Sequence, residues 1–171
     1  MHTIKDSAES GTWGFGMSEE QKYMMDIGTI LHNLFFSYQK SLRNTLGTGS
    51  EIFVDPTINL LMNIEDEDRL KLVSSPTLEE ALKNFGDFLV KSKVIHSYDI
   101  EKTGEEKYAF KVNECVWAGH IHKTIEPKDV VCPWGLVAMA LYKKFTGNTV
   151  NDRESIYYAN GSQTVLEPLM L

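Results

Sequence analysis

The residues best suited to chemistry lie in one short segment, ECVWAGHIHKTIEPKDVVCPWG, which spans residues 114–135. It holds both cysteines of the chain, Cys115 and Cys132, and two of the five histidines, His120 and His122. Thiolate and imidazole are ligands that suit zinc and ferrous iron in proteins. Cys115, His120, His122 and Cys132 are therefore candidate ligands of a zinc or iron ion.

The same segment also allows a nucleophilic cysteine. Cys132 precedes Pro133, a residue typical of the first position of a helix, and the N-terminus of a helix favours a thiolate. His122 or His120 would serve as the base, and the backbone amides of residues 134–135 would form an oxyanion hole. In a third interpretation both cysteines are packed as small apolar residues. Their spacing does not decide among the three.

The composition of the whole chain is that of an ordinary globular protein. The chain has 171 residues, of which 42% are hydrophobic and 24% charged, which fits one domain with a core of its own. The net charge is −7, and the longest basic cluster is the pair Lys143–Lys144. Nucleic-acid binding needs a basic stripe that displaces counterions, so we do not expect it here.

The sequence also bears on where the protein resides. No apolar run approaches the ~20 residues that cross a bilayer, so we expect no membrane span. The first 20 residues lack the apolar region of a secretory signal. We therefore expect a cytoplasmic protein, in which both cysteines stay free thiols.

The start of the chain predicts an arm followed by a long helix. Residues 1–16 are rich in Gly, Ser and Thr and are expected to form a flexible arm, with residues 17–171 as a single ligand-binding type of domain. Ser18 and Gln21 form a capping box, and Gly47 is placed to end the helix. Between them, apolar residues recur at three- and four-residue spacing. They are Met24, Ile27, Leu31, Leu34, Phe35, Tyr38, Leu42 and Leu46.

The remaining patterns complete an α+β fold. Further helices are predicted over residues 55–63, 78–95, 114–124 and 133–146, the first with Asp55 as its N-cap and Pro56 at its first position. Alternating residues predict a hairpin over 95–113 and a second hairpin that turns at Asn160-Gly161. The expected architecture is an antiparallel sheet of about four strands covered by helices.

Three segments carry a resemblance to a known family. They are YAFKVNEC, VCPWGLVAMALYKKFTG and VNDRESIYYANGSQTVLEP, in this order along the C-terminal half. With them the chain resembles the four-vinyl reductase domain, an α+β module that binds small molecules. That family is related in fold to trafficking-complex subunits and to haem-based nitric-oxide sensor domains. The resemblance implies an α+β fold and a small-molecule ligand.

The chain departs from this family at its last hairpin. Zinc-binding members use a Glu and two Cys around the turn, and here Glu154 matches the Glu while Tyr157 and Val165 fall near the cysteine positions. A metal would therefore depend on Cys115 and Cys132 with a histidine. The same cysteine-led segments and the Gly turn also resemble the aminothiazoline-carboxylate hydrolase-like proteins.

These observations predict a small-molecule-binding or sensor module. A small hydrophobic ligand would occupy an apolar pocket between the long helix and the sheet, with the Cys/His element beside it. The long helix is expected to supply the interface of a homodimer. The alternatives are a hydrolase with Cys132 as nucleophile and a histidine as base, and a non-catalytic scaffold subunit. The pocket would be lined by Phe35, Phe36, Tyr38, Phe85 and Phe88.

Overall fold

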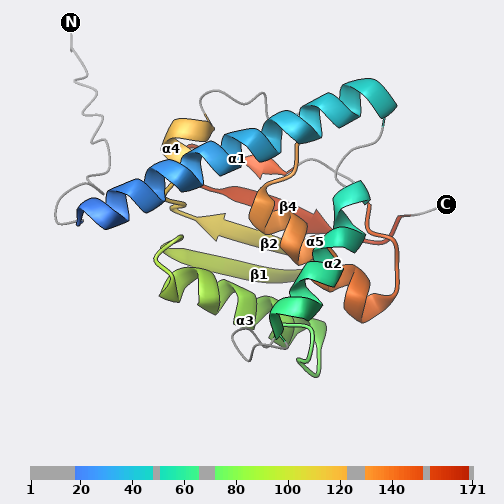
Figure 1. Ribbon diagram of the computed structural model, residues 1–171. Helices are drawn as coiled ribbons and strands as arrows, with labels where there is room; N and C mark the ends of the chain where they lie inside the picture. Colours follow the sequence, from blue (N-terminus) through green and yellow to red (C-terminus); the bar gives the residue numbers. More distant parts are fainter. Residues whose placement is uncertain (1–17, 48–50, 66–71, 123–129, 152–154, 170–171) are drawn as a thin grey trace, which may run out of the picture.

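The structure is a computed structural model that describes residues 18–47, 51–65, 72–122, 130–151 and 155–169 (Figure 1). The predicted N-terminal arm lies outside these residues. The described residues form an α+β fold, as predicted, and its elements follow the expected order. They are α1 (Glu19–Leu46), α2 (Glu51–Glu65), α3 (Leu78–Lys91), β1 (Ser97–Gly104), β2 (Lys107–Asn113), α4 (Ala118–Ile121), α5 (Pro133–Thr146), β3 (Ile156–Tyr157) and β4 (Ser162–Leu166).

The sheet joins two hairpins side by side. Its strand order is β1-β2-β4-β3, and every neighbouring pair is antiparallel. The central pair places Tyr108 opposite Leu166 and Val112 opposite Ser162. Helices α3 and α5 contact the sheet on the face that carries Phe110, while Lys111 and Gln163 alternate onto the other face. The sheet therefore has one covered face and one polar face.

Helix α5 forms the centre of the core. It begins at Pro133 and ends at Gly147, whose φ of 73° allows the left-handed cap. It packs between α2 and strands β2 and β4, so Met139, Leu141 and Tyr142 have no exposed surface. At Gly135 an added Cβ would overlap the Thr164 hydroxyl, because the helix approaches β4 closely there.

Helix α1 crosses the molecule over the rest of the fold, which we call the body (Figure 1). The predicted capping box is present, since Ser18 and Gln21 exchange hydrogen bonds, and Gly47 ends the helix with a φ of 69°. Only Phe36 and Gln39 are buried among its 28 residues. Most of the predicted apolar stripe is exposed instead. Among the helices that the structure describes, none is long and apolar enough to cross a membrane.

Four local predictions were wrong. The helix predicted over residues 114–124 is only the four-residue α4, Ala118–Ile121, because Glu114 takes a positive φ of 51° and Cys115 lies outside the helix. Helix α2 begins at Glu51 and runs through Pro56, because Val54 is buried against the core and this packing outweighs the hydrogen bond that proline removes. Helix α3 ends at Lys91, since Lys93 turns to a positive φ of 57°. Phe88 and Tyr38, expected to line one apolar pocket with Phe85, are 40% and 56% exposed, whereas Phe85 is buried in the core.

Candidate site at the thiol end of the sheet

The two cysteines lie at the same end of the sheet. Cys115 follows the last residues of β2, and its amide donates to the carbonyl of Asn160, 2.8 Å away. Cys132 caps the start of α5, and its amide donates to the Ser155 hydroxyl at 3.0 Å. Both cysteines are free thiols. The segments that carry Cys115 and Cys132 therefore lie near each other, although the two sulfurs are not bonded.

Burial keeps both thiols protonated. Cys132 is only 5% exposed, and burial raises its pKa to about 11; the Ser162 hydroxyl opposes this rise, and a thiolate at Cys115 would add to it. Burial also raises the pKa of Cys115. The amides of Trp134 and Gly135 face the Cys132 sulfur and oppose the rise in pKa, but they do not reverse it. The expectation that the N-terminus of α5 would favour a thiolate was wrong, because desolvation outweighs the helix dipole here.

The histidines of the segment do not complete a metal site in the described part of the chain. His122 lies 2.7 Å from the Tyr158 carbonyl through its Nδ1, and its ring meets that of Tyr157 at 4.8 Å. Burial lowers the pKa of His122. His120 is in α4, but its side chain lies outside the description. Within the described residues no three His, Cys, Asp or Glu side chains are grouped to hold a metal, so Cys115, His122 and Cys132 do not form such a group.

An aromatic cluster occupies the space next to Cys115. The His32 ring lies 4.7 Å from the ring of Trp117 and 5.4 Å from that of Trp134, and the two indoles stack at 5.6 Å. Phe36 adds an edge contact to His32 at 5.9 Å. We call His32, Trp117 and Trp134 the Trp–His cluster. All three side chains are partly buried, so the cluster lies between α1 and the body without being sealed from solvent.

The imidazole of this cluster is neutral. Burial lowers the pKa of His32 to about 4, the charge of a protonated His122 lowers it further, and the Gly28 carbonyl opposes both effects. Gly28 also makes room for the indole, since an added Cβ would overlap the Trp117 ring. At neutral pH the cluster therefore presents three uncharged rings.

The two indole N–H groups differ in their partners. Trp117 donates its Nε1 hydrogen to the Met25 carbonyl at 3.2 Å, which ties the indole to α1. The Nε1 of Trp134 is buried and has no hydrogen-bond partner. It faces the Cys115 sulfur, a weak acceptor, but this contact falls outside hydrogen-bonding geometry. A buried donor without a partner costs about 1–3 kcal/mol, so this group needs an explanation.

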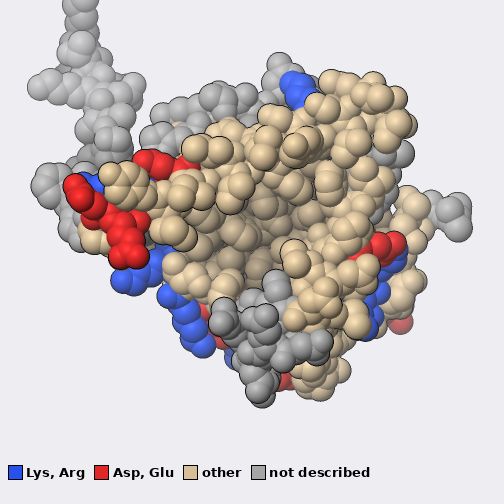
Figure 2. All heavy atoms as spheres, in the orientation of Figure 1, with Lys and Arg blue, Asp and Glu red and all other residues tan. Residues whose placement is uncertain are grey.

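The face that carries α1 is largely uncharged. Figure 2 shows a broad surface without charged side chains, hollowed between α1 and the elements beneath it, while charged groups gather around its edge. Both α1 and α3 carry large exposed apolar side chains, among them Leu31 and Phe88. This surface suits an apolar molecule better than a charged one.

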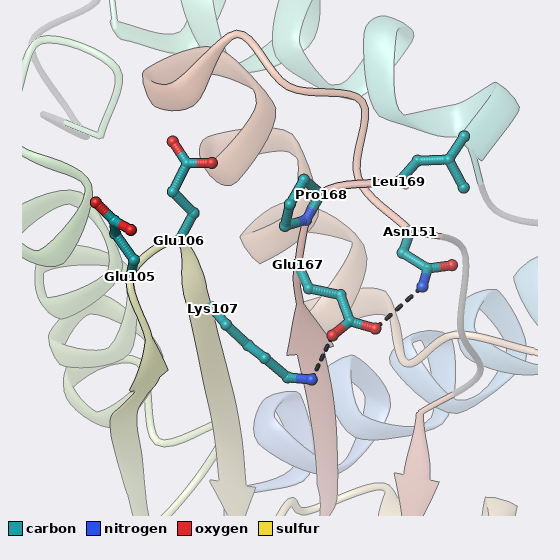
Figure 3. Close-up of a pocket in the computed structure, with 7 residues that line it drawn as sticks. All are labelled: Glu105, Glu106, Lys107, Asn151, Glu167, Pro168 and Leu169. Atoms are coloured by element: carbon teal, nitrogen blue, oxygen red, sulfur yellow. Dashed lines mark hydrogen bonds and ion pairs between the residues drawn. The ribbon is translucent and has the colours of Figure 1, made fainter. Parts of the chain in front are cut away.

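A cavity of about 890 Å³ lies at the opposite end of β2 (Figure 3). Its buried carboxylate is already paired, because Glu167 contacts the ammonium of Lys107 and accepts a hydrogen bond from Asn151 at 3.0 Å. Glu105 and Glu106 are exposed at its rim. Among the lining residues that the structure describes, this pairing leaves no buried polar group aimed at a ligand, so the cavity is a weaker candidate for the functional site.

No protein-family model, curated protein sequence or solved structure matches this chain. The resemblance to the four-vinyl reductase domain thus stays a prediction.

The sequence contained a signal for the Trp–His cluster that the spacing of cysteines and histidines did not reveal. Each cysteine is followed two positions later by a tryptophan, in Cys115-Val-Trp117 and Cys132-Pro-Trp134. The fold stacks these two tryptophans on one another. Nothing near His32 in the sequence indicates which distant rings it meets.

Proposed function

We propose that the protein is a small-molecule-binding module that acts as a homodimer. Its ligand would be a small apolar molecule with one hydrogen-bond acceptor, held at the Trp–His cluster. The observation that carries this proposal is the buried Nε1 donor of Trp134, which has no partner within the described residues. A ligand carbonyl or ether oxygen would satisfy this donor, while its apolar part would contact the rings.

The electrostatics of the site support the same class of ligand. The imidazole is neutral, both thiols are protonated, and no charged side chain belongs to the cluster. A charged ligand would lose its hydration without gaining an ion pair, which is unfavourable. A neutral molecule with an aromatic or aliphatic body avoids this cost.

The hydrolase alternative receives less support. A nucleophilic cysteine must be accessible and easily ionised, whereas Cys132 is buried and its pKa is raised to about 11. The amides that would form the oxyanion hole face the sulfur of Cys132 itself. The proposed binding function needs neither an ionised thiol nor a metal.

A matched pair of probes tests the proposal. Acetophenone and ethylbenzene have similar size, but only the ketone carries a good acceptor. We expect proton–nitrogen correlation spectra to show the Trp134 indole N–H resonance moving with the ketone. We also expect the ketone to bind about 3- to 10-fold more tightly than the hydrocarbon, the contribution of one hydrogen bond.

Two variants serve as the test and its control. Trp134→Phe removes the donor and keeps most of the apolar ring, so the preference for the ketone should disappear. Trp117→Phe keeps the Trp134 donor, so the preference should remain. An unchanged preference in Trp134→Phe, or indole resonances that neither probe moves, would contradict the proposal.

A further inference from the structure

Helix α1 carries two separate apolar surfaces. Successive residues of a helix are about 100° apart, so Gly28, His32, Phe36 and Gln39 share the side that faces the body. A second group of large apolar residues lies roughly 130° around the helix from that side. These residues are 47–66% exposed, and we call them the α1 stripe. They are Tyr23, Met24, Ile27, Ile30, Leu31, Leu34 and Tyr38.

The spacing in the α1 stripe is that of a helix-pairing seam. Met24, Ile27, Leu31, Leu34 and Tyr38 alternate steps of three and four residues, the pattern of positions a and d in a heptad. This pattern is nearly symmetrical about Leu31, since Met24 and Tyr38 are each seven residues from it. A seam that is symmetrical about its midpoint suits two identical helices running in opposite directions.

The area of the α1 stripe is large enough for a stable pair. If a large apolar side chain has about 200 Å² of surface, the stripe exposes roughly 800 Å². Standard protein–protein interfaces bury about 800 Å² on each partner. Patches of this size are unusual on a monomer and mark interaction surfaces.

The charges of α1 favour an antiparallel pair. Its first turns carry three acids, Glu19, Glu20 and Asp26, against one base, whereas its last turns carry the bases Lys40 and Arg43 and no acid. Figure 2 shows acidic groups where α1 begins and a basic group toward its other end, with uncharged surface between them. An antiparallel pair places ends of opposite charge together, and a parallel pair would place like charges together.

We propose that the α1 stripe is the interface of a homodimer in which two α1 helices pack antiparallel and cross near Leu31. This inference deepens the homodimer of the proposed function and does not depend on the ligand. The occupant is a second copy of this chain, because a self-symmetrical seam and segregated charges match one another. Residues 1–17 of the same chain, which include Trp13 and Phe15, are the competing occupant that the experiment must exclude.

Sedimentation analysis of the full chain tests the interface. We expect a dimer whose dissociation constant rises about 100-fold or more in Leu31→Glu, because two unpaired carboxylates would be buried at the crossing point. Asn33→Glu adds the same charge on the polar side of α1 and should leave the dimer unchanged. Both positions are exposed, so circular dichroism should show both variants folded.

Disulfide trapping tests the orientation. A mixture of Met24→Cys and Tyr38→Cys chains should cross-link, whereas neither variant should cross-link to itself. Self-linking of Met24→Cys would mean a parallel pair and would overturn the orientation. If Leu31→Glu still forms a dimer, the proposed interface is wrong, but the protein is a homodimer through another surface. A monomeric chain that dimerises only after deletion of residues 1–16 would overturn both in favour of the arm.

Discussion

Helices α3 and α1 begin alike but use their apolar residues in opposite ways. Both start at a side-chain cap, Thr77 for α3 and Ser18 for α1. Yet α3 buries six of its 14 residues, and α1 buries two of its 28. A helical repeat of apolar residues therefore predicts that a face will be covered, but it does not say by what.

The two helices differ in burial because they are attached to the rest of the fold in different ways. Helix α3 leads directly into β1, and its Phe85 stacks on Phe110 of the sheet with ring centroids 5.7 Å apart. Helix α1 is held by separate polar anchors. The Gln39 amide exchanges two hydrogen bonds of 2.9 Å with the backbone of Val131, and the Trp117 indole donates to the Met25 carbonyl.

A pair of leucine truncations should give the largest difference in the free energy of unfolding between the two helices. Leu82→Ala on α3 should lower the free energy of unfolding by about 2–5 kcal/mol, because it leaves a cavity in the core. Leu31→Ala on α1 should change it by about 0.5 kcal/mol or less in dilute, monomeric protein, because this side chain is already exposed. Urea titrations measure both values. Equal losses would show that the two helices are covered in the same way.

Removal of the Gln39 anchor should have the next largest effect. Gln39→Met keeps the length of the side chain but leaves the buried amide and carbonyl of Val131 without partners, which should cost about 2–3 kcal/mol. Hydrogen exchange along α1 should accelerate more than exchange in α5. Ser41→Met, at an exposed position of the same helix, is the control and should leave both quantities unchanged.

The smallest expected effect is a dependence on pH that His32 introduces. In the unfolded chain His32 takes up a proton near pH 6.5, whereas in the folded protein its pKa is about 4. Stability should therefore fall as the pH is lowered, by roughly 2 kcal/mol between pH 7 and pH 5. His32→Gln should flatten this profile, while His96→Gln at an exposed position should not. An unchanged profile in His32→Gln would mean that α1 does not bury this ring.

Local signals were sufficient to predict much of the fold. The capping box at Ser18, Pro133 at the start of α5 and Gly147 at its end all act within a few residues, and the structure confirms each of them. The second hairpin is also present, but its loop spans residues 158–161, because Tyr157 pairs with Ser162, and neither Asn160 nor Gly161 has the positive φ of a two-residue turn. These local signals were sufficient to predict the order of the helices and strands along the chain. The pairing of β2 with β4 and the docking of α1 depend on distant residues, so no short pattern contained them.

The candidate site could be predicted only in outline. Proximity in sequence correctly placed Cys115 and Cys132 at one end of the fold, but it did not reveal how deeply Cys132 would be buried. Burial decides the protonation of a thiol, and it follows from packing across the whole domain. The same reason explains why Gln39 was missed, since a polar residue is buried only where a distant partner satisfies it.

The anchors of α1 also impose a delay while the chain is being made. Gln39 and Val131 are 92 positions apart, and so are Met25 and Trp117. At about 5–20 residues per second, the ribosome needs on the order of 5–20 s to produce the second member of each pair. During that interval Gln39 and Met25 lack these distant partners, so α1 cannot dock until most of the domain has been synthesised.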